Sequence, residues 1–206
     1  MDYTPSDSDA DKTIVMTVTA DDRDPAETGD GNGTEGVGVD GNNTVQDTFN
    51  IDVSDTNDGP SVDDFTDQSV DEDASLTFSS GNGNAFSVSD PDDFGADMEA
   101  TVSVEHGTVT PSSGSGASLS GDGTASLTLT GTETEINDAL DGLVYTPDPD
   151  FHTDGTAGPE TITVTINDQG NTGTGGTKSD TQSADIDVKP VNDRPTASGS
   201  HTVTVG

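Results

Sequence analysis

Two short phrases in this sequence combine residue types that bind hard metal ions with a proline that ends a strand. The chain reads "TNDGP" at residues 56–60 and "VNDRP" at residues 191–195, each after a stretch in which apolar and polar residues alternate. Carboxylates, Asn side-chain carbonyls and backbone carbonyls supply the six to eight oxygens, at about 2.3–2.6 Å, that Ca²⁺ requires. The phrases therefore predict either cation sites at module junctions, or polar turns in which Asn and Asp bond their own backbone.

The charge of the chain also points to cations as its first partner. It has 41 Asp plus Glu against 5 Lys plus Arg, for a formal net charge of −36 over 206 residues. Repulsion at this charge density opposes compaction unless cations screen or bind the carboxylates. Most of the acidic residues are Asp, whose short side chain holds a carboxylate close to a turn backbone. A high-salt habitat, in which an acidic surface is a general solubility adaptation, explains the same charge and is compatible with specific sites.

Composition argues against several classes of function. The chain has no Cys, and hydrophobic residues make up only 26 % of it, so we expect bound metal to tie together weakly cored domains. The acidic surface repels phosphate backbones, which argues against nucleic acid. No apolar run approaches the roughly 18 residues of a membrane span, and the N-terminus lacks a signal pattern, as expected for an internal piece of a longer protein. The three His residues share no motif with a nucleophile, so we do not expect an enzyme.

The elements that must position these residues are short strands. Apolar residues alternate with polar ones from residue 14 to residue 188, and turn residues interrupt the alternation at short intervals, as at "GDG" (121–123). One stretch, "TETEINDALDGL" (132–143), has helical spacing instead, with a capping-box pair at Thr132 and Glu135. The pattern predicts an all-β chain of tandem antiparallel β-sandwich modules with one short crossover helix.

The order of the motifs repeats along the chain. "DYTP" at 2–5 is similar to "VYTP" at 144–147, "TIVMTVTADD" at 13–22 to "TITVTINDQG" at 161–170, and "NIDVSDTNDGP" at 50–60 to "DIDVKPVNDRP" at 185–195. We therefore expect residues 1–58 to be the C-terminal half of one module and 59–194 to be a complete module. Residues 195–206 would be the first strand of a following module.

With these residues in view, the chain resembles the cadherin-like (Ig-like β-sandwich) tandem repeats of large bacterial and archaeal calcium-dependent surface adhesins. The resemblance covers 59–206 and, more weakly, 1–58. The stretches that carry it are "DEDASLTF" (71–78), "FSVSDPDD" (86–93), "SVEHGTVT" (103–110), "INDALDGLVYTPDPDF" (136–151), "TITVTINDQGNTGTGGTKSDT" (161–181) and "VNDRP".

The resemblance implies that each junction between modules binds Ca²⁺. Cadherin junctions commonly read Asp-x-Asn-Asp-Asn-x-Pro, and "DTNDGP" at 55–60 supplies Asp55, Asn57 and Asp58 at the matching places, with Gly59 in the last polar position. "PVNDRP" at 190–195 departs further, with Pro190 for the first Asp and Arg194 for the last Asn, so this junction is expected to bind more weakly or to take ligands from elsewhere. The implied junction ligands are Asp55, Asn57, Asp58, Asn192 and Asp193.

Further ligands are implied on the loops of the modules. They are Glu72 on the first strand of the complete module, Asp90 and Asp92 in "SDPDD", Asp168 in "INDQG", and Asp21 or Asp22 as the counterpart of Asp168 in the first half-module. We expect the linker to meet the end of one module, near Asp21, and the start of the next, near Glu72 and Asp90. An ordinary Asp-Pro-Asp turn is the alternative for Asp90 and Asp92.

These expectations lead to a structural function with three alternatives. The chain would be an extracellular, Ca²⁺-rigidified tandem extender of a cell-surface adhesin, with calcium ions and neighbouring modules of the same chain as partners. The first alternative is a subunit of a head-to-tail filament, in which identical subunits complete one another by strand addition. The others are a glycan-binding module and a spacer beside a secreted enzyme.

Overall fold

A computed structural model of the chain describes residues 13–21, 44–153, 158–171 and 173–195. The chain divides into two compact units, Met1–Thr56 and Asn57–Gly206, which are considered separately below. The described residues are mostly β-strand, with one short α-helix, so the all-β prediction is confirmed. The predicted segment 195–206 and Asp22 lie, apart from Pro195, outside the described residues.

Unit 1 is an antiparallel hairpin of two long strands in its described part. Strand β1 (Thr13–Asp21) pairs with β2 (Thr44–Asp52), with Ile14 opposite Ile51 and Met16 opposite Phe49. No side chain described in this unit is buried, and Phe49 is 47 % exposed. Because an isolated two-stranded hairpin is marginally stable in water, the described part of unit 1 supplies little stability of its own.

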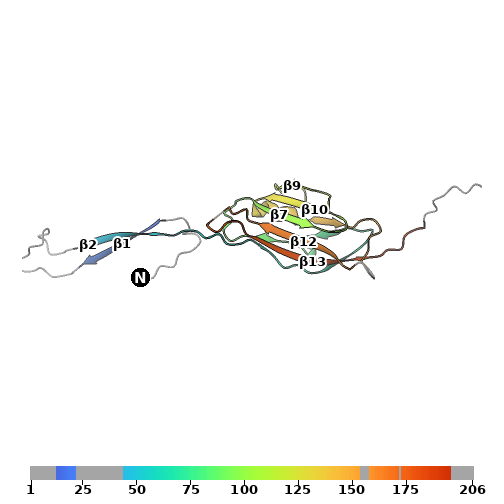
Figure 1. Cartoon of the computed structure of the whole chain (residues 1–206), viewed down its shortest axis with the longest axis horizontal. Helices are drawn as coiled ribbons and strands as arrows, with labels where there is room; N and C mark the ends of the chain where they lie inside the picture. The colour runs from blue at the N-terminus through green and yellow to red at the C-terminus, as the bar shows by residue number, and fades with distance from the viewer. Residues whose placement is uncertain (1–12, 22–43, 154–157, 172, 196–206) are drawn as a thin grey trace, which may run out of the picture. The chain divides into compact units, whose positions relative to one another are not determined.

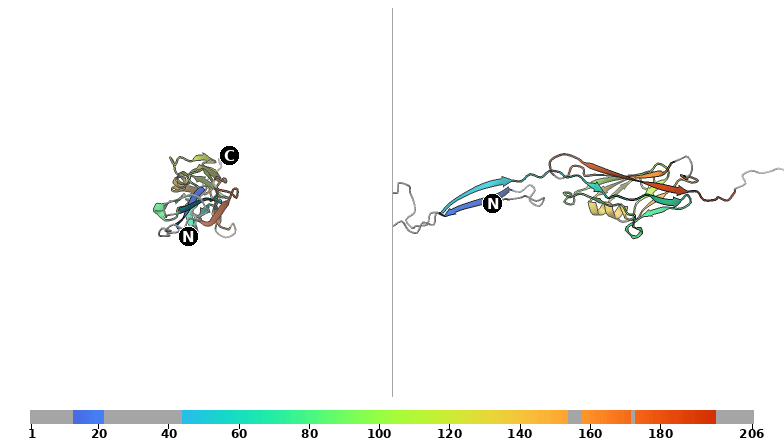
Figure 2. Two further views of the ribbon diagram at one scale, coloured as in Figure 1. Left: turned by 90° about the vertical axis from the view of Figure 1, so that its left-hand side faces the viewer. Right: turned by 90° about the horizontal axis from the view of Figure 1, so that it is seen from below.

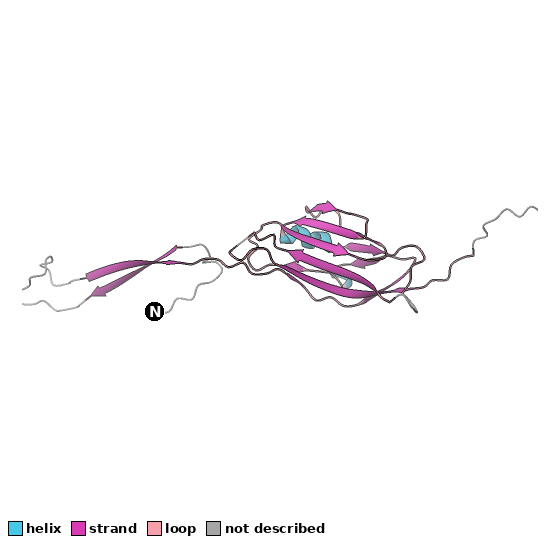
Figure 3. Ribbon diagram, in the orientation of Figure 1, coloured by secondary structure: helices cyan, strands magenta, loops and turns pink. Residues whose placement is uncertain are grey.

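Unit 2 is a β-sandwich (Figure 1; Figure 3). Its large sheet has the strand order β4-β13-β12-β7-β10-β9, and two smaller sheets have the orders β5-β11-β8 and β3-β6. In chain order the elements are β3 (Ser61–Val62), β4 (Gln68–Asp71), β5 (Leu76–Phe78), the 3-10 helix η2 (Ser80–Asn82), β6 (Val88–Ser89), β7 (Met98–Ser103), β8 (Thr108–Thr110), β9 (Ser118–Ser120), β10 (Ser126–Gly131), α1 (Glu133–Leu140), β11 (Leu143–Thr146), β12 (Glu160–Asn167) and β13 (Ser179–Lys189).

The core of unit 2 is built from the inward positions of the alternating strands. Every second residue of β12 is buried, and Ile162, Val164 and Ile166 are fully so. Phe78 stacks on Phe86 with ring centroids 4.4 Å apart, and Tyr145 is also fully buried. Alternation with period two thus places one face of each strand in the core, as the sequence predicts.

The single α-helix forms where the sequence predicts it. Thr132 and Glu135 make the reciprocal capping box, and the inward residues Ile136, Ala139 and Leu140 are buried. The hairpin predicted at "GDG" is also present, since β9 and β10 pair on either side of it. Gly121 has φ +80°, and a Cβ there would lie 2.1 Å from the Ser126 carbonyl, so the turn requires glycine.

One strand pair departs from the antiparallel expectation. Strand β4 pairs with β13 in parallel, with Gln68 opposite Ile186 and Asp71 opposite Lys189. Alternation alone does not encode strand direction, and nearly the whole module lies between the two strands, so the long connection that a parallel pair needs is available. As a result, the end of β4 at Asp71 lies beside the C-terminal end of β13 at Lys189.

Strand β13 runs along unit 2 (Figure 2, right). A group of polar residues lies at each of its two ends. The 11 residues of β13 span about 33 Å. We call the end where β13 begins the N-terminal pole, comprising Asn57, Asp58, Asp90, Asp92, Asp168 and Lys178. We call the other end the C-terminal pole, comprising Glu72, Lys189, Val191, Asn192 and Asp193.

Candidate metal centre

Asn57, the first residue of unit 2, is held through nearly all of its polar atoms. Its backbone N–H donates to the Thr174 carbonyl at 3.0 Å, and its Nδ2 donates to Asp168 Oδ2 and to the Gly176 carbonyl, both at 2.7 Å. The Lys178 ammonium donates to its backbone carbonyl. Only the side-chain Oδ1 is left: it is buried without a hydrogen-bond partner, at a cost of about 1–3 kcal/mol. This oxygen is therefore available to a cation.

A chain of carboxylates continues the N-terminal pole. The Asp58 N–H donates to Asp92 Oδ2 at 2.9 Å, the Asp92 N–H to Asp90 Oδ1 at 3.2 Å, and the Asp90 N–H to Glu133 Oε2 at 3.2 Å. Asp90 and Asp92 are only 7 % and 3 % exposed. The Asp-Pro-Asp turn considered from the sequence is thus formed, with the Asp90 side chain closing it. The same turn buries two carboxylates beside the linker residue Asp58.

Asp168 is the best-satisfied carboxylate of this pole. Its Oδ1 accepts the N–H groups of Gly170 and Lys178, each at 2.8 Å, and its Oδ2 accepts Asn57 Nδ2. Burial acts to raise the pKa of Asp168, but these hydrogen bonds, with the Lys178 charge, lower it below its usual range. Asp168 is therefore ionised at neutral pH and fixed in position, as a metal ligand must be.

The surroundings of Asp90 shift its pKa in the opposite direction. Burial, a hydrogen bond with Asp92, and the negative charges of Asp92 and Asp168 raise its pKa from 3.8 to about 6. Burial and the neighbouring carboxylates together outweigh the one backbone hydrogen bond that favours the ionised form of Asp90. An added cation at this pole would oppose this rise in pKa, because an opposite charge favours the ionised form.

This shift predicts how stability depends on pH in EDTA. The folded-state pKa of Asp90 is raised, so its contribution is complete below about pH 4 and is lost as the pH rises through about 6. We expect the thermal midpoint to increase by a few degrees from pH 7.5 to pH 5. Asp168 opposes this trend only below about pH 4, because its pKa is lowered. Calorimetry in EDTA at several pH values tests this. Asp90→Asn should flatten the slope, and a wild-type midpoint that falls toward pH 5 would contradict the prediction.

Glu72 does not lie at the pole where it was expected. Its backbone N–H donates to the Lys189 carbonyl at 2.9 Å, and its Oε1 accepts the Val191 N–H at 2.7 Å. The expectation that Glu72 and Asp90 meet at one junction is wrong, because the parallel pairing of β4 with β13 carries Glu72 to the C-terminal pole. There it neighbours the second Asn-Asp-x-Pro phrase, whose Asn192 and Asp193 are exposed.

The remaining predicted ligands lie outside unit 2. Asp21 ends β1, and Asp55 precedes the boundary between the units. Within unit 2 the structure brings together Asn57, Asp58, Asp90, Asp92 and Asp168, and it places Glu72 beside the chain that leads to Asn192 and Asp193.

The residues of the N-terminal pole fit Ca²⁺ by the chemistry of their donors. Among the described residues, no group of three or more His, Cys, Asp or Glu side chains converges on one point where it could hold a metal ion. Ca²⁺, however, takes amide and backbone carbonyl oxygens beside carboxylates, and it tolerates irregular geometry. A buried amide oxygen without a partner, next to buried carboxylates, is such a donor set. It is a poor set for Zn²⁺, which prefers nitrogen and sulfur.

A further buried carboxylate, Glu160, was not anticipated from the sequence. It accepts the backbone N–H groups of Glu105 and His106 at 2.6 and 3.0 Å, and His106 Nδ1 lies 2.9 Å from Oε2. The Tyr145 hydroxyl donates to the His106 carbonyl at 2.7 Å, and the His106 ring stacks on Phe151. The available signal was that Glu160 occupies an inward position of the β12 alternation, where a charge needs internal partners.

Glu160 therefore serves as a structural brace between β12 and the turn before β8. We expect Glu160→Ala to lower the free energy of unfolding by about 2 kcal/mol, because it leaves three donors without an acceptor at a turn that water partly reaches. Urea denaturation measures this loss. Glu105→Ala, which removes an exposed carboxylate and leaves the backbone donors paired, is the matched control. Equal losses in the two variants would contradict the assignment.

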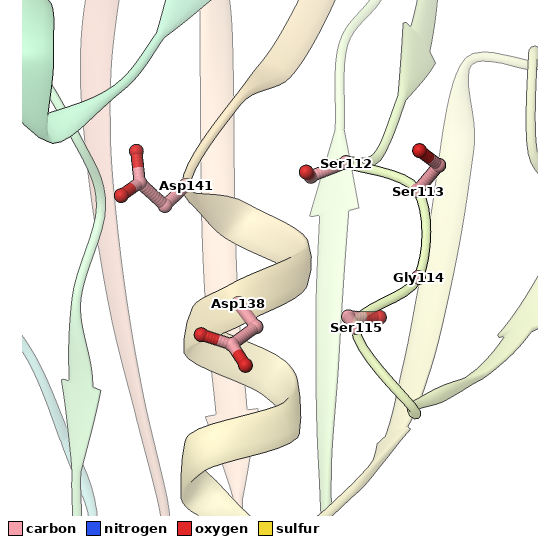
Figure 4. A pocket seen from close by; sticks show the side chains of 6 residues that line it. All are labelled: Ser112, Ser113, Gly114, Ser115, Asp138 and Asp141. Atoms are coloured by element: carbon pink, nitrogen blue, oxygen red, sulfur yellow. The ribbon is translucent and has the colours of Figure 1, made fainter.

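One hollow of about 270 Å³ lies beside α1, away from the poles (Figure 4). It is lined by Ser112, Ser113, Gly114, Ser115, Asp138 and Asp141. Asp141 is already bonded to the Ser80 N–H and hydroxyl, at 2.9 and 2.8 Å, which lowers its pKa. Small-molecule sites are mostly apolar, whereas this lining is polar throughout, so the hollow does not favour the glycan-binding alternative.

Comparisons with known proteins found no match from which a function could be assigned. No model of a known protein family matches the chain, and no curated protein is significantly similar to it. In the described part of the chain, no helix is long and apolar enough to span a membrane.

Proposed function

We propose that this chain is a Ca²⁺-rigidified tandem extender of an extracellular, cadherin-like surface adhesin. The observation that carries the proposal is the N-terminal pole, where Asn57 Oδ1 is buried without a partner among the buried carboxylates of Asp90, Asp92 and Asp168. Asn57 and Asp58 belong to the segment that joins the units, so a cation bound here would be held by the linker and by the body of unit 2 at once.

The mechanism follows from charge and chain connectivity. Without a cation, the like charges of Asp90, Asp92 and Asp168 repel one another beside the linker residues Asn57 and Asp58, and this repulsion favours an open hinge. When bound, Ca²⁺ neutralises these charges and supplies one centre to which linker and body oxygens can attach. The chain's own contribution is to hold Asp168 ionised and Asn57 Oδ1 unpaired. Such a joint makes the flexible connection between modules rigid. A rigid connection transmits tension along a tandem array.

We expect the C-terminal pole to be a weaker junction of the same kind. Glu72 is buried beside Val191, where the chain continues into Asn192 and Asp193. Pro190, however, stands where the first phrase has the oxygen-bearing Asp55, and Arg194 stands where it has Gly59. The Arg194 charge also opposes a cation. The acidic surface as a whole fits a partner set of metal ions and neighbouring modules, and it disfavours nucleic acid.

Measurement of the distance between the units tests the proposal. The chain has no cysteine, so Thr48→Cys with Ser183→Cys gives one spin label on each unit for electron double-resonance spectroscopy. We expect a broad distance distribution in EDTA that narrows in Ca²⁺, because the hinge closes around the ion. A distance distribution that is as broad at saturating Ca²⁺ as in EDTA would refute the proposed rigid connection.

Two control pairs make that result interpretable. Thr13→Cys with Thr48→Cys reports whether the β1–β2 hairpin is formed, because both residues lie on that hairpin. Asn82→Cys with Ser183→Cys lies wholly within unit 2 and should give the same distribution with and without Ca²⁺. Adding Asp92→Asn to the inter-unit pair should prevent the narrowing.

A further inference from the structure

Lys178 is the one cationic side chain of the N-terminal pole. The whole chain has 5 Lys plus Arg, so a lysine among buried carboxylates is conspicuous. Its ammonium donates to the Asn57 backbone carbonyl, and its backbone N–H donates to Asp168 Oδ1 at 2.8 Å. The residue therefore touches both the linker and a carboxylate of the candidate centre.

The Lys178 side chain packs against Gly59 of the linker. A Cβ placed on Gly59 would lie 3.5 Å from Lys178 Cδ and 3.6 Å from its Cβ, so the aliphatic stem runs against this glycine. These distances are ordinary van der Waals contacts, so the Lys178 stem packs directly against the linker at residue 59. The backbone pairing of Asp168 with Lys178, in which the Asp168 N–H donates to the Lys178 carbonyl at 3.1 Å, fixes the base of the side chain.

The charge of Lys178 acts on the carboxylates around it. It contributes to the lowered pKa of Asp168, although it leaves the pKa of Asp90 raised. A single positive charge thus relieves part of the repulsion at the pole. It also opposes any further cation, because like charges in a partly buried site repel strongly.

We propose that Lys178 is an internal counter-ion that competes with Ca²⁺ for the N-terminal pole and so sets the affinity of the site. This inference rests on the proposed function. When Ca²⁺ is scarce, the Lys178 ammonium bonds the Asn57 carbonyl, and when Ca²⁺ binds, the ammonium leaves that carbonyl. The affinity is thereby shifted toward the high Ca²⁺ concentrations of extracellular modules, about 10⁻⁴–10⁻³ M.

The test measures Ca²⁺ binding to the whole chain by isothermal titration calorimetry, and stability in EDTA by thermal unfolding. Lys178→Gln should tighten Ca²⁺ binding at least about fivefold, within the usual range for coupled sites, and should lower the midpoint in EDTA. The matched control is Lys189→Gln at the other end of β13, where the ammonium donates to Ser69 Oγ at 3.2 Å. It makes the same change in net charge and should alter the affinity of the N-terminal site less than twofold.

The outcomes separate this inference from the proposed function. If the wild-type chain binds no Ca²⁺, the proposed function fails, and the competition fails with it. If it binds Ca²⁺ with an affinity that Lys178→Gln leaves unchanged or weakens, only the role of Lys178 is overturned. Equal tightening in both variants would also overturn it, because the effect would then belong to net charge alone.

A second measurement needs no variant and so does not depend on Lys178→Gln folding. The chain has lysines at positions 12, 178 and 189, and acetylation of each can be followed by mass spectrometry. Ca²⁺ should speed the acetylation of Lys178 relative to Lys189 several-fold, since an ammonium released from the Asn57 carbonyl is more accessible. Equal or slower acetylation of Lys178 in Ca²⁺ contradicts its release.

Discussion

In about 5 mM CaCl₂, at a fixed and screening concentration of NaCl, the thermal midpoint of this chain should lie at least roughly 10 °C above its midpoint in EDTA. A ligand that binds only the folded state stabilises it by mass action. An ion with a dissociation constant near 10⁻⁴ M contributes about 2 kcal/mol at this concentration, and further ions at the junctions add to it. Circular dichroism or calorimetry measures the shift.

The same concentration of MgCl₂ is the control for general charge screening. Mg²⁺ demands near-octahedral geometry and gives up its waters reluctantly, so the irregular donor set around Asn57 should favour Ca²⁺. We expect Mg²⁺ to reproduce only a small part of the shift. Equal midpoints in EDTA, Mg²⁺ and Ca²⁺ would mean that the carboxylates are a salt-adapted surface, and the metal assignments would fall.

The second large effect concerns Asp168. Asp168→Ala should lower the free energy of unfolding in EDTA by about 3–5 kcal/mol, because the Lys178 and Gly170 N–H groups and the Asn57 amide would lose their shared acceptor. Urea unfolding measures the loss. It is expected with or without metal, so it tests the hydrogen-bonded geometry of the pole independently of Ca²⁺.

Two comparisons sharpen this result. Asp185→Ala removes an exposed carboxylate from β13, whose contact with Thr161 Oγ1 is a long 3.4 Å, and should cost less than about 1 kcal/mol. In Ca²⁺, most of the stabilisation seen for the wild-type chain should be lost from Asp168→Ala and should persist in Asp185→Ala. An Asp168→Ala protein as stable as the wild type in EDTA would show that the donors around Asp168 find other partners.

Local pattern predicted most of the elements but not how they are assembled. The alternation of Ile162, Val164 and Ile166 predicts a strand with one buried face, and the Thr132–Glu135 pair predicts the start of the helix, because both depend on neighbours within a few residues. Strand direction and partners depend on residues far apart in the sequence. The parallel pairing of β4 with β13, which carries Glu72 away from Asp90, was therefore not foreseen.

For the candidate centre, too, the sequence predicted some features and the tertiary structure decided others. By itself, the sequence determined the oxygen-rich chemistry, the acidic charge and the linker phrase that contains Asn57 and Asp58, because these are properties of residue type and local order. Only the tertiary structure decided that Asp90, Asp92 and Asp168 lie at one pole with Lys178, that Asn57 Oδ1 is left without a partner, and that Glu160 braces His106. The physical reason is that burial, pairing and pKa depend on which distant segments the fold brings within a few ångströms, and residue order alone does not specify that.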